Sequence, residues 1–78
     1  MRKTEARLKQ ILAEQFSLRE EDLTGDFAFD GLAMDSLEWM ELAVALEEEF
    51  DIPLADIKLR QIKSLRQMAE IITERIRE

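Results

Sequence analysis

The 78-residue sequence predicts an all-α fold, a small four-helix bundle of three main helices and one short helix, with a long loop between the first and second helices. In three segments apolar residues recur every three to four positions, the period of an amphipathic helix. No alternation of apolar and polar residues lasts long enough to predict a strand. The length predicts a single domain over residues 1–78.

The first helix is predicted over residues 5–16 by four apolar residues at helical spacing: Leu8, Ile11, Leu12 and Phe16. Residues 17–34 lose that period and contain both glycines of the chain, so they are predicted to form the long loop. Since this loop also contains Phe27, Phe29 and Leu32, we expect it to pack back onto the bundle.

The second helix is predicted to begin at residues 35–36, because Asp35 and Glu38 have the spacing of a capping box, and to run to Phe50. Pro53 then breaks the pattern. A short helix over residues 54–62 is predicted from Leu54, Ile57, Leu59 and Ile62. Ser64 and Gln67 form a second capping-box pattern, and an apolar stripe then continues to the end of the chain at Leu65, Met68, Ala69, Ile72 and Ile76.

The net charge of −7 is concentrated in the middle of the chain. Residues 17–35 carry one basic and six acidic side chains, and residues 36–50 carry five acidic side chains and no basic one. Such a field repels nucleic acid and attracts basic protein surfaces. No apolar run is long enough to span a membrane, and the first residues lack the apolar core of a secretion signal, so we expect a cytoplasmic protein. We also expect a monomer.

The second helix carries two apolar stripes when it is projected at 3.6 residues per turn. One is wide enough to be the buried face and holds Trp39, Leu42, Ala43, Leu46 and Phe50. The second starts beside Ser36 and holds Leu37, Met40 and Val44, bordered by Glu47 on one side and by Glu41 and Glu48 on the other. The projection directs Glu38, Ala45 and Glu49 to solvent.

We interpret the second stripe as a docking face for a basic protein, in which apolar residues supply contact area and the carboxylates fix register. The alternative is that the helix is buried on two sides and that the stripe is covered by the long loop or by the third helix.

Ser36 lies at the start of the second helix, where its hydroxyl could have one of three roles. A catalytic nucleophile is disfavoured, because the chain contains no histidine to serve as a general base and no local lysine. A helix cap and an attachment point for a group added by another protein both remain open. No metal site is expected: Ala28 and Leu37 stand where a calcium-binding EF-hand loop needs ligands, and the chain has no cysteine.

The motif Asp35-Ser36-Leu37-Glu38, followed by Glu41-Leu42, by the run from Ala45 to Asp51 and by Ile52-Pro53, resembles the acyl carrier protein family over nearly the whole chain. The resemblance implies that a phosphopantetheinyl transferase attaches 4′-phosphopantetheine from coenzyme A to Ser36, where its thiol would hold acyl groups in fatty-acid or polyketide-like biosynthesis. It implies a carrier that is not an enzyme. Its partners would be the transferase and acyl-processing enzymes with basic docking surfaces, such as a ketosynthase, acyltransferase or ligase.

The resemblance also assigns a partner-binding surface to Asp35, Leu37, Glu38, Met40, Glu41, Val44, Glu47 and Glu48. Two positions depart from the family pattern: Ala33 stands where the family commonly has glycine, and Trp39 is bulky where many relatives carry a smaller residue. The alternatives are a carrier for D-alanine or another amino acid, and an unmodified helical interaction module in which Ser36 is only a cap.

Overall fold

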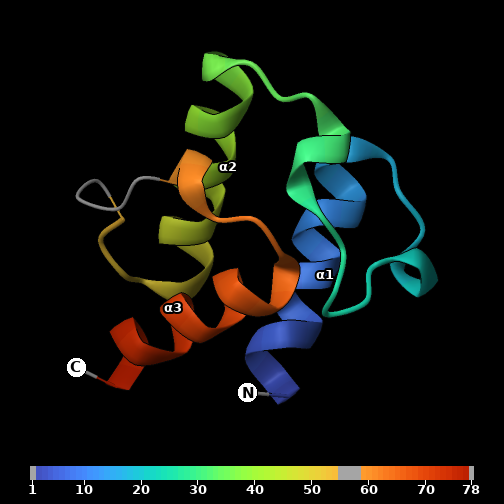
Figure 1. Cartoon of the computed structure of the whole chain (residues 1–78). Helices are drawn as coiled ribbons and strands as arrows, with labels where there is room; N and C mark the ends of the chain where they lie inside the picture. Colours follow the sequence, from blue (N-terminus) through green and yellow to red (C-terminus); the bar gives the residue numbers. More distant parts are fainter. Residues whose placement is uncertain (1, 55–58, 78) are drawn as a thin grey trace.

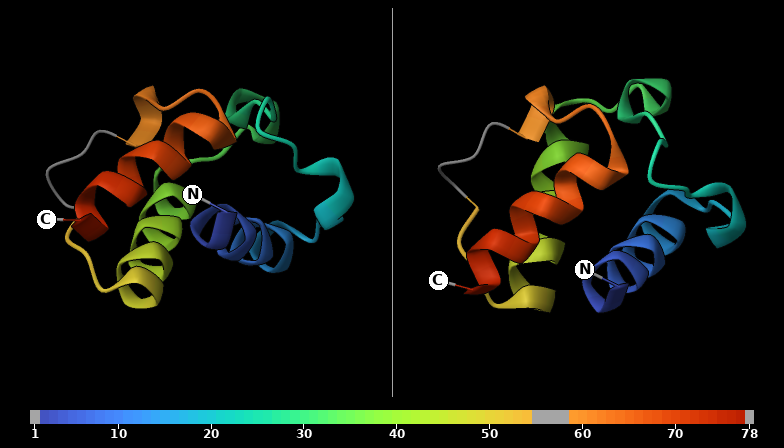
Figure 2. Two further views of the ribbon diagram at one scale, coloured as in Figure 1. Left: turned by 90° about the horizontal axis from the view of Figure 1, so that it is seen from below. Right: turned by 60° about the horizontal axis from the view of Figure 1, so that its bottom comes forward.

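The computed structural model describes residues 2–54 and 59–77 of the chain. In that part the chain forms three α-helices, α1 (Arg2–Phe16), α2 (Ser36–Phe50) and α3 (Leu65–Arg77), and three short 3₁₀ turns, η1 (Glu20–Asp22), η2 (Phe29–Leu32) and η3 (Leu59–Gln61). The predicted all-α class is confirmed. Helices α1 and α2 lie side by side, and α3 packs across them (Figures 1 and 2). No helix in the described ranges is long and apolar enough to cross a bilayer.

The predicted boundaries of the main helices agree with the structure apart from the start of α1, which begins three residues earlier, at Arg2. Helix α1 ends at Phe16, and Ser17 then adopts a left-handed conformation with φ 55°. Of the predicted short helix over residues 54–62, the structure has the 3₁₀ turn η3, and residues 55–58, including Ile57, lie outside the described residues.

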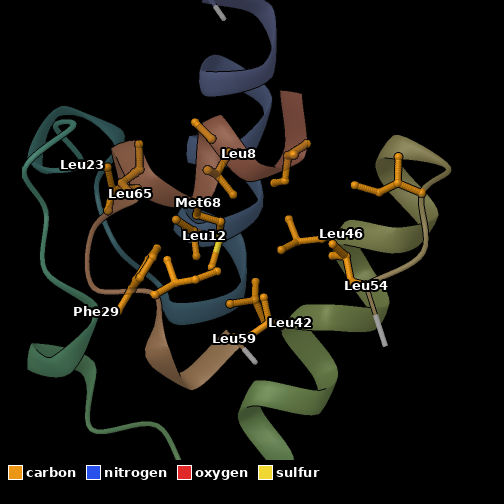
Figure 3. Packing of buried hydrophobic residues seen from close by; sticks show 14 residues of the cluster. Leu8, Leu12, Leu23, Phe29, Leu42, Leu46, Leu54, Leu59, Leu65 and Met68 are labelled. Atoms are coloured by element: carbon orange, nitrogen blue, oxygen red, sulfur yellow. The ribbon is translucent and has the colours of Figure 1, made fainter. Parts of the chain in front are cut away.

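Within residues 2–54 and 59–77, the core brings together fourteen buried apolar side chains from all three α-helices and from the connections between them (Figure 3). Leu8 and Leu12 of α1 meet Leu42 and Leu46 of α2, as the helical periods predict. Helix α3 and the segment before it add Leu54, Leu59, Ile62, Leu65, Met68, Ala69 and Ile72. The predicted stripe of α3 extends one turn too far, because Ile76 lies near the end of the helix and is 48% exposed.

The long connection between α1 and α2 packs onto the bundle, as expected, because it is tied to the start of α3. The amide of Phe29 donates to the carbonyl of Lys63, and the amide of Leu65 donates to the carbonyl of Phe27, both at 3.0 Å. The amide of Arg66 donates to the carbonyl of Gly25, also at 3.0 Å. These bonds place Phe29 in the core with 2% of its surface exposed, and its ring contacts that of Phe27 edge to face.

Ser64 caps the start of α3, since its hydroxyl accepts from the amide of Gln67 at 3.2 Å. The Gln67 side chain accepts from the amide of Lys63, one residue before the position expected in a regular capping box. The predicted helix start is therefore correct, and the reciprocal bond is displaced by one residue.

Candidate functional site

The mouth of α2 is built by a capping box that presents Ser36 as the first residue of the helix. The Asp35 carboxylate accepts from the amide of Glu38 at 2.8 Å, and the Glu38 carboxylate accepts from the amide of Asp35 at 3.3 Å. These bonds satisfy backbone donors that a helix end leaves without intrahelical partners. Ser36 is exposed at the N-terminal end of the helix.

The approach to Ser36 is a tight turn. Ala33 follows η2 in a left-handed conformation, with φ 49° and ψ 45°, and its amide donates to the carbonyl of Asp30 at 3.3 Å. Glycine adopts this conformation at little cost, whereas a Cβ makes it unfavourable. The left-handed conformation of Ala33 favours glycine at this position, so the alanine that departs from the family pattern makes the turn less stable.

The second stripe of α2 is open to solvent, and this decides between the two interpretations of it. Leu37, Met40 and Val44 are 62%, 61% and 47% exposed, whereas Leu42 and Leu46 are completely buried. Neither the long loop nor α3 covers the stripe, so burial on two sides is wrong. The three residues line a shallow hollow of about 370 Å³ together with Glu41, Ala45 and Glu48. Ala45 is half-buried at the edge of the hollow, so the prediction that it faces open solvent is wrong.

The carboxylates around the stripe differ in what they contact. Glu41 and Glu48 line the hollow, and no hydrogen bond or ion pair joins them to another residue in the described part of the chain. The Glu47 carboxylate accepts from the backbone amide of Leu54 at 2.7 Å in a partly buried site. Glu49 pairs with Arg7 of α1 at 2.7 Å between Oε2 and Nε. Glu41 and Glu48 are therefore the carboxylates of the stripe that a partner can reach without breaking an internal bond.

Trp39 lies one turn after Ser36, on the opposite side of α2 from the stripe. It is half-buried, and its ring packs edge to face on Phe29 with 6.3 Å between the ring centroids. The bulky residue that departs from the family pattern is thus a packing residue, and it joins the start of α2 to the long connection.

The sequence around Ser36 lacks the residues that usually activate a catalytic serine. The sequence contains no histidine or cysteine, and no lysine neighbours Ser36 in the chain, so the general base that a catalytic serine requires is absent from its sequence neighbourhood. An exposed serine, a helix N-terminus and an adjacent exposed apolar strip are typical of a surface that another protein binds.

Comparison with known proteins agrees with this geometry. Residues 6–72 match the protein family described as "Phosphopantetheine attachment site". The acyl carrier protein of Buchnera aphidicola subsp. Acyrthosiphon pisum (strain Tuc7) is 36% identical over 76 residues, which cover 96% of this chain and 95% of the relative. The chain belongs to the acyl carrier protein family. The acyl carrier protein from strain APS of the same organism shows the same identity and coverage.

Membership identifies the chain as a carrier of acyl groups that uses 4′-phosphopantetheine. The residues at the mouth of α2 are suited to that group. An exposed serine offers the oxygen of a phosphodiester, and the positive end of the α2 dipole favours a phosphate. Since the protein has no cysteine, the thiol of the attached group supplies the thioester chemistry when it is bound. The structure also adds Ala45 to the predicted partner-binding surface, because Ala45 lines the hollow. The helical projection placed Ala45 in solvent, since a projection of one helix omits the neighbouring helices.

Proposed function

We propose that Ser36 is the residue that receives 4′-phosphopantetheine and that the acyl groups belong to fatty-acid or polyketide-like biosynthesis. The observation that carries the proposal is the exposed Ser36 at the first position of α2, next to an exposed apolar strip. In the reaction, the Ser36 oxygen forms a bond to the β-phosphorus of coenzyme A as the bond to 3′,5′-ADP breaks. The hydroxyl proton passes to a base supplied by the transferase.

The proposed docking face consists of the exposed strip and the acidic residues around it: Asp35, Leu37, Glu38, Met40, Glu41, Val44, Glu47 and Glu48. The strip supplies apolar contact area, and Glu41 and Glu48 supply charges that lie seven residues, or about 10 Å, apart along the helix. A partner with basic groups on either side of an apolar side chain is complementary to this pattern. Asp35 and Glu38 contribute mainly by holding the start of the helix.

We further propose that the chain has no catalytic activity of its own and acts as a single-domain monomer. Partner enzymes supply the catalysis, namely a phosphopantetheinyl transferase and acyl-processing enzymes with basic docking surfaces. A cytoplasmic location follows from the proposed reaction, because coenzyme A and its transferase react with carriers in the cytoplasm.

Intact-mass analysis tests the attachment site. Wild-type protein incubated with coenzyme A and a phosphopantetheinyl transferase is expected to gain the mass of one phosphopantetheine group, and Ser36→Ala is expected to gain none. Ser64→Ala is the matched control, since Ser64 also begins a helix, and it should still be modified. Modification of Ser36→Ala would overturn the assignment. The same measurement on protein from its native host would give the mass of the cargo, and an alanyl or other aminoacyl mass would move the proposal to an aminoacyl pathway.

Charge reversal tests the docking face. Glu41→Lys and Glu48→Lys are expected to slow modification about tenfold at low salt, with a smaller effect at high salt, because the exposed charges act through a screened field. An effect that does not change with salt would contradict electrostatic docking.

A further inference from the structure

A second hollow adjoins the docking face on the side of α2 that is nearer to α1. It lies between the two helices, which run side by side (Figure 2). Its lining comes from Ile11, Glu14 and Gln15 of α1 and from Ala45, Glu48 and Glu49 of α2. Ala45 and Glu48 also line the apolar hollow, so the two hollows form one continuous surface across α2.

The second hollow retains negative charge after its internal pairing is counted. Arg7 donates to Glu49 at 2.7 Å and to the side chain of Gln10 at 2.8 Å. The hydrogen bond and the charge of Glu49 raise the pKa of Arg7, and the charge of Glu14 adds a smaller effect in the same direction. Neither Glu14 nor Glu48 has a hydrogen bond or ion pair with another described residue. Arg7 therefore bonds to Glu49 and Gln10, whereas Glu14 interacts with Arg7 through its charge alone and Glu48 bonds to no described residue.

The shape and chemistry of the groove fit one kind of side chain. Ile11 and Ala45, both half-buried, give it apolar surface, and Glu14 and Glu48 contribute carboxylates from the two helices. Lysine and arginine combine an aliphatic stem that packs on apolar surface with a cationic head that seeks carboxylates.

We propose that the docking surface of this carrier extends over Ala45 into the groove between α1 and α2, where Glu14 and Glu48 together receive a lysine or arginine side chain of the basic partner. The inference rests on the proposed function and adds a residue of α1, Glu14, to a surface otherwise formed by α2. The apolar hollow then receives an apolar side chain of the same partner, and the adjacent groove receives its cation.

The test measures KM and kcat for modification of the full chain by a phosphopantetheinyl transferase with saturating coenzyme A. Glu14→Lys is expected to raise KM for the carrier about fivefold at low salt and leave kcat nearly unchanged, because a charge at the edge of an interface acts mainly on encounter. Glu70→Lys is the matched control, since Glu70 is exposed on α3 and the charge change is identical; its KM should change less than about twofold. Circular dichroism at the assay temperature verifies that each variant is folded.

A double variant examines whether the two carboxylates act on one cation. If they do, the increase in KM for Glu14→Gln combined with Glu48→Gln differs from the product of the two single increases, since residues that share a partner are not additive. An increase equal to that product would mean that the two carboxylates act independently, which would contradict a shared cation. Equal KM values for Glu14→Lys and Glu70→Lys, with Glu48→Lys still impaired, would overturn the extension and leave the docking face on α2 in place. Failure of the wild-type chain to be modified at Ser36 would overturn the proposed attachment site, and this inference with it.

Discussion

We predict that Glu47 stabilises the end of α2 through one hydrogen bond. Replacing it with alanine should lower the free energy of unfolding by more than is usual for a surface glutamate. Its carboxylate accepts from the amide of Leu54 at 2.7 Å, and Leu54 is 2% exposed. Removing the acceptor leaves a poorly hydrated N–H without a partner, which costs about 1–3 kcal/mol. We expect Glu47→Ala to lose about 1–2 kcal/mol, because the site is only partly buried. In a domain of this size that corresponds to a fall in Tm of about 4–16 °C.

Two further variants separate the hydrogen bond from the charge. Glu47→Gln keeps a side-chain oxygen that can accept from the Leu54 amide, so it should lose about half as much stability as Glu47→Ala. Glu48→Ala, one residue further on, removes an exposed carboxylate without a bond to any described residue and should change stability by less than about 0.5 kcal/mol. Thermal unfolding followed by circular dichroism gives all three values.

Amide hydrogen exchange gives a local reading of the same bond. In Glu47→Ala the Leu54 amide should exchange about tenfold faster than in the wild type, since 1.4 kcal/mol corresponds to a factor of ten. The reasoning is refuted if Glu47→Ala and Glu48→Ala unfold at the same temperature and the Leu54 amide exchanges at the wild-type rate in both.

The remaining predictions concern the turn before α2, the two stripes of α2 and the tie between the long loop and α3. Ala33→Gly should raise the free energy of unfolding by about 0.5–1 kcal/mol, measured by urea denaturation, because glycine relieves the left-handed strain and loses only part of that gain to chain entropy. Leu42→Ala should cost about 2–5 kcal/mol, whereas Leu37→Ala should cost less than about 0.5 kcal/mol; equal losses would contradict the assigned faces. Gly25→Ala should change Tm by only a few degrees, because the new Cβ would lie 2.6 Å from Nη2 of Arg66, the end of an exposed and flexible side chain that can move aside.

Trp39 shows how packing constrains the end of α2 that carries Ser36. Its ring meets Phe29, which is held in the core by the bond between the Phe29 amide and the Lys63 carbonyl. The start of α2, the long connection and the residues before α3 are thus joined through one aromatic contact. This linkage fixes the position from which an arm on Ser36 would extend.

The sequence by itself was sufficient to predict the features that depend on residues close together in the chain. The capping box of Asp35 and Glu38 and the cap at Ser64 need only neighbouring residues, so the starts of α2 and α3 were correct. Helical periods likewise separated Leu42 and Leu46 from the stripe at Leu37, because a helix projects its side chains at fixed angles. The motif around Ser36, combined with the acidic run at the end of α2, was sufficient to indicate the family.

Tertiary structure decided what depends on residues that are distant in the chain. Whether the stripe beside Ser36 was covered or open depended on where α3 and the long loop packed, and the exposure of Leu37 answered it. Three features join different segments of the chain. They are the hydrogen bond from the Leu54 amide to Glu47, the ion pair between Arg7 and Glu49, and the groove that both Glu14 and Glu48 line. A projection of one helix cannot predict these features. Hydrogen bonds and ion pairs act over a few ångströms, so they can be assigned only when the backbones of both partners have been placed.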